Sequence, residues 1–168
     1  MSPVTSKAEQ IITLAAEKSV LIGTAESCTG GMIAAALTDI AGSSIAVDRG
    51  FITYSNDAKS AMLGVDPTII DDHGAVSSQV VEAMARGAVS ALSLSDHGIA
   101  ISVSGVAGPG GGSSEKPVGL VWFGLAHRQG DSVIVTSMAM HFAGSRHDVR
   151  TAATDHALDM ILNLLMDL

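Results

Sequence analysis

The sequence is poor in several residue types, and each shortage excludes a class of protein. It contains one cysteine, Cys28, so no disulfide can form within the chain, as is usual in a reducing cytoplasm. Nine basic residues against seventeen acidic ones give a net charge of −8, which argues against general nucleic-acid or membrane-surface binding. No apolar run reaches the roughly 20 residues that span a bilayer, and the N-terminus lacks a signal-peptide pattern. We therefore expect a cytoplasmic protein without membrane contacts.

Aromatic residues make up only 3% of the chain, whereas Ala, Ser and Gly together supply 62 of its 168 residues. A hydrophobic fraction of 47% excludes a disordered chain, so the core must consist of closely packed small and aliphatic side chains. At this length the expected organisation is one domain over residues 1–168.

Periodicity and turn residues predict an α/β protein. Helical spacing predicts helices over residues 5–18 and 30–38, after caps at Ser55 or Asn56 and at Ser77 or Ser78, and from Ser145 onward. Apolar runs predict strands over 20–25, 50–54, 98–104, 118–126 and 132–142, the last two as a hairpin, and residues 105–117 can only be a loop. Helices between the early strands favour parallel pairing, and the hairpin must be antiparallel. A mixed sheet of about five strands with helices on both faces follows.

Three polar segments follow predicted strand ends, at residues 26–31, 54–59 and 104–112. Ligands of such sheets bind at the carboxyl ends of the strands, so this is where we expect a site.

The first segment contains two nucleophile candidates, Ser27 and Cys28. A serine at a strand-to-helix turn can expose its hydroxyl, and N–H groups of the following helix can face an anion or oxyanion. Alternatively, Ser27 or Thr29 is only a helix cap, and Cys28 is a small buried thiol, since no histidine partner is evident.

In the second segment Tyr54 ends a strand and Lys59 lies one turn into a helix. A lysine whose pKa burial depresses can be the base for a serine hydroxyl, with a tyrosine sharing the proton relay. The alternative is a surface lysine beside a tyrosine at a sheet edge.

The third segment has five glycines in residues 105–112, and Arg146 opens the last predicted helix. Backbone N–H groups of such a loop can approach a phosphate, and an arginine can complete an anion site, although the P-loop pattern is absent. A flexible connection and a solvated helical turn are the alternatives. The six histidines lack metal-ligand spacing, so no metal site is expected.

Seven motifs occur in order: AESCTGG at 25–31, AGSS at 41–44, GFITYSN at 50–56 with Lys59, GAVS at 74–77, SGVAGP at 104–109, KPVG at 116–119 and FAGSR at 142–146 with Arg150. Together they resemble the CinA family, that is, the carboxy-terminal domain of competence/damage-inducible protein CinA. The resemblance implies a three-layer α/β/α sandwich with a mixed, mostly parallel sheet of about five strands. It also implies a stand-alone, homo-oligomeric amidohydrolase that deamidates nicotinamide mononucleotide (NMN) to nicotinate mononucleotide and ammonia.

By motif, the resemblance makes Ser27 the nucleophile, with Lys59 and Tyr54 as its basic partners, and no metal or organic cofactor is required. The expected substrate-binding residues are Cys28, Thr29, Gly30, Gly31, Asn56, Ser104, Gly105, Gly108, Gly110 and Arg146. The chain departs from the family at Ser104, where threonine is usual, and at Ser145, where an acidic residue is usual.

Two other functions stay open. A catalytically silent nucleotide-binding or interaction module could keep the same motifs. A dehydrogenase that uses Ser, Tyr and Lys is disfavoured, because Tyr54 and Lys59 are five residues apart instead of four and no Gly-x-Gly-x-x-Gly follows the first strand.

Overall fold

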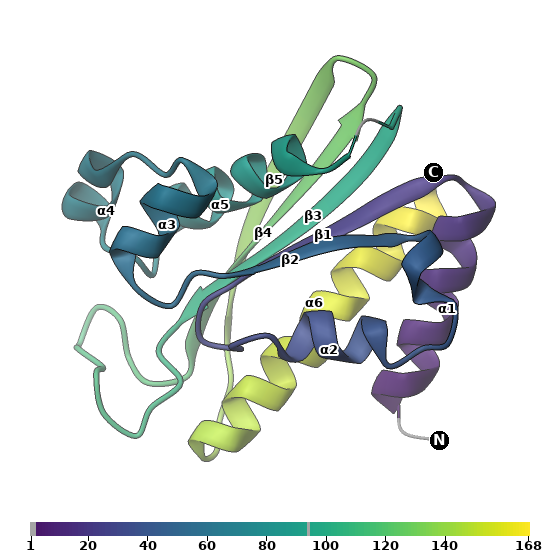
Figure 1. The fold of residues 1–168 in the computed structure, drawn as a ribbon. Helices are drawn as coiled ribbons and strands as arrows, with labels where there is room; N and C mark the ends of the chain where they lie inside the picture. The colour runs from purple at the N-terminus through teal and green to yellow at the C-terminus, as the bar shows by residue number, and fades with distance from the viewer. Residues whose placement is uncertain (1–2, 94) are drawn as a thin grey trace.

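Five strands form one sheet between two layers of helices (Figure 1). The computed structural model describes residues 3–93 and 95–168. In chain order the elements are α1 (Pro3–Glu17), β1 (Val20–Glu26), α2 (Met32–Thr38), the 3₁₀ helix η1 (Ser43–Ile45), β2 (Val47–Ile52), α3 (Asn56–Leu63), α4 (Pro67–His73), α5 (Ser78–Ala91), β3 (His97–Gly105), β4 (Leu120–Gln129), β5 (Ser132–His141) and α6 (Arg146–Asp167). None of the helices in these residues combines the length and apolar character that a membrane crossing requires.

The strand order is β2-β1-β3-β4-β5. β1 pairs in parallel with both β2 and β3, whereas β4 pairs antiparallel with both β3 and β5. The predicted mixed sheet of five strands is therefore confirmed. Four strands run in one direction and only β4 is reversed, but parallel pairs do not predominate among neighbours, because the hairpin places β4 between two strands that run the other way.

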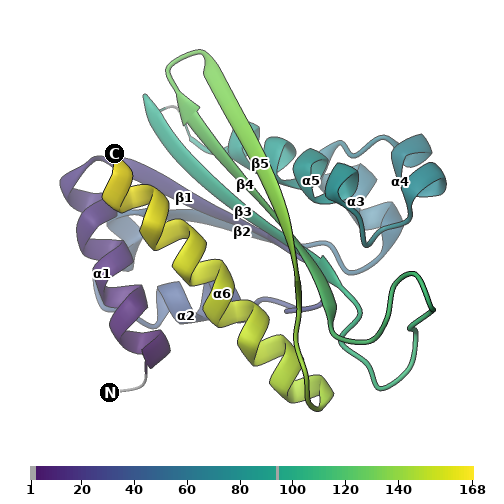
Figure 2. The same cartoon turned by 180° about the vertical axis from the view of Figure 1, so that it is seen from behind.

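The two helical layers pack against the sheet in different ways. α1, α2 and α6 cover one face, and α3, α4 and α5 lie on the other (Figures 1 and 2). The first face buries larger side chains such as Ile22, Ile99 and Ile101. On the second face α5 lies close to the sheet over small residues: a Cβ at Gly124 would lie 2.4 Å from the carbonyl oxygen of Val81 in α5. The abundance of alanine and glycine thus supports one closely packed helix-sheet layer.

Two predicted strands begin or end elsewhere in the structure. The strand expected over 50–54 is β2, Val47–Ile52, whose charged residues Asp48 and Arg49 interrupt the apolar pattern because it is an edge strand. The strand expected from residue 118 begins at Leu120, because Gly119 has a φ of +95° in the preceding turn. The short elements η1 and α4 were not expected.

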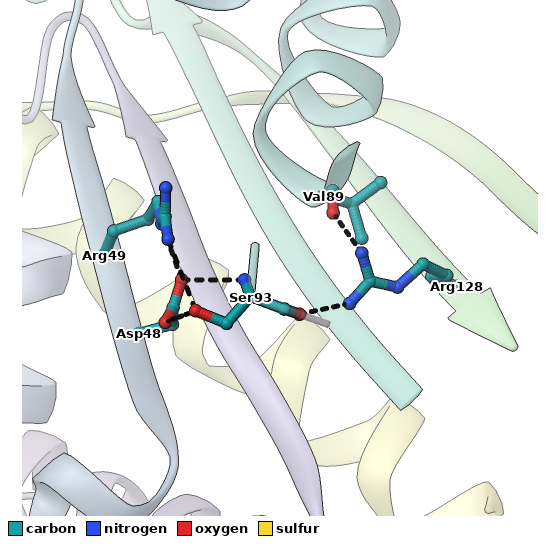
Figure 3. A network of polar contacts seen from close by, with 5 residues as sticks. All are labelled: Asp48, Arg49, Val89, Ser93 and Arg128. Atoms are coloured by element: carbon teal, nitrogen blue, oxygen red, sulfur yellow. Dashed lines mark hydrogen bonds and ion pairs between the residues drawn. The ribbon is translucent and has the colours of Figure 1, made fainter. Parts of the chain in front are cut away.

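A polar network joins the start of β2 to the end of α5 (Figure 3). Ser93 donates to the carboxylate of Asp48 from its N–H (3.2 Å) and its hydroxyl (2.7 Å). From β4, Arg128 donates to the carbonyl oxygens of Val89 (3.1 Å) and Ser93 (2.9 Å). Arg128 thereby satisfies carbonyls at the C-terminal end of α5. Since Arg128 pairs with Gly98 near the start of β3, the network lies at the opposite end of the sheet from the carboxyl end of β1.

Candidate active site at the carboxyl ends of β1 and β2

The hydroxyl of Ser27, directly after β1, meets the amine of Lys59. Lys59 Nζ lies 3.2 Å from Ser27 Oγ and donates to the carbonyl oxygen of Thr53 at 2.9 Å. Backbone hydrogen bonds hold both segments in place. The N–H of Ser27 donates to the carbonyl oxygen of Val103, and the N–H of Thr53 donates to the carbonyl oxygen of Glu26. The structure thus brings together two of the polar segments that follow strand ends.

Lys59 is buried, with 1% of its surface exposed, so the interpretation as a surface lysine is wrong. Within the described residues it forms no ion pair with a carboxylate. Burial lowers the pKa of Lys59, because the charged ammonium loses its hydration in the protein interior and is therefore disfavoured relative to the neutral amine. An amine that loses its proton more readily, next to a serine hydroxyl, is suited to accept a proton from that hydroxyl.

Cys28 is a poor nucleophile in this environment. It is 6% exposed, and burial raises the pKa of its thiol to about 11, although the charge of Arg150 acts in the opposite direction. The thiolate is the reactive form, so at neutral pH Cys28 is an inert, small buried side chain.

The N-terminus of α2 is capped by Glu26, not by Ser27 or Thr29. The Glu26 carboxylate is fully buried and accepts from the N–H groups of Gly31 (3.0 Å), Ile33 (3.1 Å) and Ala34 (2.9 Å) and from the hydroxyl of Thr29 (2.7 Å). These N–H groups are therefore not free for an anion, and the expectation that the start of this helix faces one is wrong.

The N–H groups left in this turn are those of Cys28 and Thr29. Gly30 donates its N–H to the carbonyl of Ser27, whereas within the described residues no other residue accepts from the N–H group of Cys28 or of Thr29. Gly30 and Gly31, at φ +60° and +99°, therefore allow the turn to form but offer no free N–H.

Arg150 in α6 holds this turn from outside. Its Nε donates to the carbonyl oxygen of Cys28 and its Nη2 to that of Thr29, each at 3.0 Å. Arg150 belongs to the last of the seven motifs, but the motif alone predicts no role for it. Its spacing of four residues from Arg146 was the available signal, since this spacing places both side chains on one face of α6.

A second group of predicted residues meets at the start of α6. Arg146 donates to the hydroxyl of Tyr54 and to the carbonyl oxygen of Gly108, both at 2.8 Å. Tyr54 is 62% exposed, and no hydrogen bond of the described residues joins its hydroxyl to Ser27 or Lys59. Arg146 forms no ion pair in the same part of the chain, so its charge is available to an anion.

The remaining predicted residues have different environments. The hydroxyl of Ser104 donates to the carbonyl of Ala75 at 2.7 Å, and a Cβ at Gly105 would lie 2.8 Å from the carbonyl of Leu120. A Cβ at Gly110 would meet nothing within 4 Å, so this part of the loop is open. Asn56 is exposed and lines a separate cavity of about 450 Å³ between α3 and α4. Among residues 3–93 and 95–168, no three His, Cys, Asp or Glu side chains gather closely enough to hold a metal ion.

Fold and site together define an α/β protein with a buried serine-lysine pair at the carboxyl end of a mixed sheet. The family model described as the CinA C-terminal domain matches residues 4–165, and the chain belongs to this family. Nicotinamide-nucleotide amidohydrolase PncC of Escherichia coli K12 is 47% identical over 153 residues, which cover 91% of this chain and 89% of that protein.

Other similar proteins carry competence names. A competence-damage inducible relative in Caldicellulosiruptor bescii is 46% identical over 95% of this chain, which spans 37% of that relative's length. The crystal structure of competence/damage inducible protein CihA from Agrobacterium tumefaciens has a TM-score of 0.88 at 44% identity, and the match covers 98% of this chain and 96% of that one. The predicted family and α/β fold are confirmed.

Proposed function

We propose that this protein is an amidohydrolase that converts NMN to nicotinate mononucleotide and ammonia. The name of the PncC relatives supports the substrate, and the family membership supports the reaction. The single observation that carries the chemistry is the 3.2 Å contact between Ser27 Oγ and the amine of Lys59. This amine is a suitable base, because it is buried and has no carboxylate partner among the described residues, so its pKa is lowered.

The first half of the reaction forms an acyl-enzyme. Neutral Lys59 accepts the proton of Ser27, whose oxygen attacks the carboxamide carbon of NMN. The N–H groups of Cys28 and Thr29 hold the resulting oxyanion. The tetrahedral intermediate then collapses, Lys59 returns the proton to the leaving nitrogen, and ammonia departs.

In the second half Lys59 takes a proton from water, and the hydroxide attacks the ester carbon. Collapse of this second intermediate breaks the bond to Ser27, which regains its proton from Lys59, and nicotinate mononucleotide leaves as the carboxylic acid, whose proton passes through solvent to the released ammonia. Every proton that Lys59 accepts from Ser27 or water is returned within the same half of the reaction, so no other protein base is required.

Arg146 and the loop around Gly108 are the proposed partners of the substrate phosphate, because a guanidinium without a carboxylate partner suits a phosphate. The bond from Arg146 to Tyr54 favours a role for Tyr54 in orienting this arginine over a role in the proton relay. A cytoplasmic location, a homo-oligomeric state, the absence of general nucleic-acid binding and a single-domain organisation stay predictions.

The test is incubation of the purified chain with NMN, with ammonia release and product mass as readouts. We expect equimolar ammonia and nicotinate mononucleotide, at the same rate with and without a chelator. Binding of NMN without product would instead identify a silent nucleotide-binding module. Activity that a chelator abolishes and a divalent ion restores would contradict the metal-free mechanism.

A further inference from the structure

Arg150 contacts only backbone atoms of the turn that follows Ser27. From the second turn of α6 its guanidinium donates to two successive carbonyl oxygens, those of Cys28 and Thr29, at 3.0 Å each. The guanidinium is part-buried, and no ion pair of the described residues includes Arg150. Its contacts to the turn are therefore with backbone alone.

These two bonds fix the orientation of the peptide planes after Ser27. A trans peptide is planar, and its N–H points opposite to its C=O. When Arg150 holds the carbonyl of Cys28, the N–H of Thr29 must point away from α6. The bond from the N–H of Gly30 to the carbonyl of Ser27 orients the preceding plane in the same manner and so sets the direction of the Cys28 N–H.

The turn is also held from its other side. The hydroxyl of Thr29 donates to the buried carboxylate of Glu26, at 2.7 Å. This bond and the two bonds from the guanidinium of Arg150 together restrain rotation of the peptide that joins Cys28 to Thr29. The N–H groups of Cys28 and Thr29, which no other described residue accepts from, are thus oriented before a substrate binds.

We propose that Arg150 is a positioning residue that preorganises the oxyanion site formed by the N–H groups of Cys28 and Thr29. This inference rests on the proposed amide hydrolysis. Preorganised donors lower the barrier because they need no rotation when charge develops on the carbonyl oxygen. Loss of Arg150 should therefore affect kcat much more than KM, because the oxyanion exists only after attack.

The experiment compares Arg150→Met and Arg150→Lys with Arg128→Met, at a temperature where circular dichroism shows all of them folded. Arg128 is a matched control, because it too donates to two backbone carbonyls, at the far end of the sheet (Figure 3). We expect kcat for NMN to fall about 10- to 100-fold in Arg150→Met, less than loss of a whole oxyanion donor, with KM changed less than about threefold. Arg150→Lys should lose less, since one ammonium can keep one carbonyl, and Arg128→Met should retain the wild-type kcat.

Two further readouts separate positioning from general stability. Guanidinium ion at millimolar concentration should raise the kcat of Arg150→Ala above its value in sodium chloride of equal ionic strength, and should leave Arg128→Ala unchanged. By ¹⁵N relaxation, the order parameters of Cys28, Thr29 and Gly30 should fall from about 0.85 to below about 0.6 in Arg150→Met only.

The outcomes distinguish the two proposals. Wild-type activity on NMN with an unchanged kcat in Arg150→Met overturns the role of Arg150 and leaves the proposed function standing. A wild type without activity overturns the proposed function, and the relaxation measurement then decides whether Arg150 orders the turn. Equal losses of kcat in Arg150→Met and Arg128→Met, or an unchanged turn by relaxation, would overturn the inference.

Discussion

Lys59 is an amine kept from water and from every carboxylate of the described residues, with one backbone carbonyl and one serine hydroxyl as its polar partners. Burial of an ionisable group is costly unless the group is paired or neutral. Such an arrangement is typical of functional sites, because burial lowers the pKa of the amine and makes its neutral, basic form easier to reach.

Ser27 and its neighbour Cys28 should differ sharply on substitution. We expect Ser27→Ala to lower kcat by several orders of magnitude, because no other hydroxyl of the described residues forms a hydrogen bond with Lys59, whereas Cys28→Ala should lose less than about tenfold. The physical reason is the pKa of Cys28, about 11, which leaves almost no thiolate at neutral pH. Steady-state kinetics with NMN measures both, and a wild-type rate in Ser27→Ala would reject the assignment.

The pH profile of kcat/KM should rise to a plateau with one acidic limb set by Lys59. Protonated Lys59 cannot accept the serine proton, so activity falls as pH drops through its pKa, which burial places below its ordinary value near 10.5. The limb should persist in Cys28→Ala. Lys59→Arg should not restore activity, because a guanidinium keeps its proton. A limb that disappears with Cys28, or a fully active Lys59→Arg, would remove Lys59 as the base.

How far the sequence predicts the site depends on the distance between partners. The contact between Ser27 and Lys59 could be expected, because both follow strands whose carboxyl ends meet at one edge. The role of Glu26 could not, since rules for helix caps consider the residue next to the helix, and Glu26 reaches α2 across a turn. The bonds from Arg150 to Cys28 and Thr29 join residues more than 120 positions apart, which no local pattern reveals.

At the scale of elements, the first two turns of α6 serve two parts of the site. Ser145 caps the helix, and Asp148 accepts in return from the N–H of Ser145, which forms a capping box. The helix thus keeps a side-chain cap although Ser145 stands where the family usually has an acidic residue. Arg146 and Arg150, four residues apart, then contact Gly108 and the turn after β1, respectively.

The elements were predicted best where burial decides the pattern. The interior strands β1 and β3 are buried along nearly their whole length, so their apolar runs marked them in the sequence. The edge strand β2 is half-exposed and charged, and the short helix α4 depends on one cap at Asp66 followed by Pro67. Such elements are stabilised by their neighbours more than by their own sequence.

The start of α6 and the glycine loop should discriminate NMN from nicotinamide riboside, which lacks the phosphate. One charge-assisted contact contributes about 1.5–3 kcal/mol, so wild type should prefer NMN in kcat/KM by roughly 10- to 150-fold. Arg146→Met should lose most of this preference while its rate on the riboside changes little. Lys116→Met is the comparison, because Lys116 belongs to the same loop but donates to the carbonyl of His73. Loss of the preference in Lys116→Met alone would assign the phosphate to Lys116.

For the whole molecule, the two ends of the sheet differ in what they stabilise. The end near Arg128 pairs helix carbonyls and a carboxylate with side-chain donors (Figure 3), although Nε of Arg128 is itself buried without a partner among the described residues. The end near Ser27 contains a buried amine without a carboxylate, and the buried hydroxyl of Thr53 lacks a partner among the described residues. Active sites often contain buried polar groups that lower the free energy of unfolding. Replacing the buried amine of Lys59 with an apolar group should therefore increase the stability of the fold.

Lys59→Met should therefore abolish turnover and raise the melting temperature at pH 7. The aliphatic stem is replaced at similar volume, and the cost of burying an ionisable group without a charged partner is removed; each kcal/mol gained shifts Tm by roughly 2–4 °C.

This stabilisation should depend on pH in a direction that follows from proton binding. Unfolding becomes less favourable as pH rises wherever the unfolded chain binds more protons than the folded one. Because burial lowers the pKa of Lys59 in the fold, wild type gains stability between that lowered value and about 10.5, and loses it as pH falls through this range. Lys59→Met lacks this dependence, so its advantage in Tm should shrink as pH is raised from 7 toward 10.

Scanning calorimetry of both proteins across this range is the measurement, with Lys18→Met as a control at a lysine outside the core. The quantity that decides is the Tm of Lys59→Met minus the Tm of wild type. If this difference stays constant with pH, or is smaller at pH 7 than at pH 10, the buried amine does not destabilise the fold.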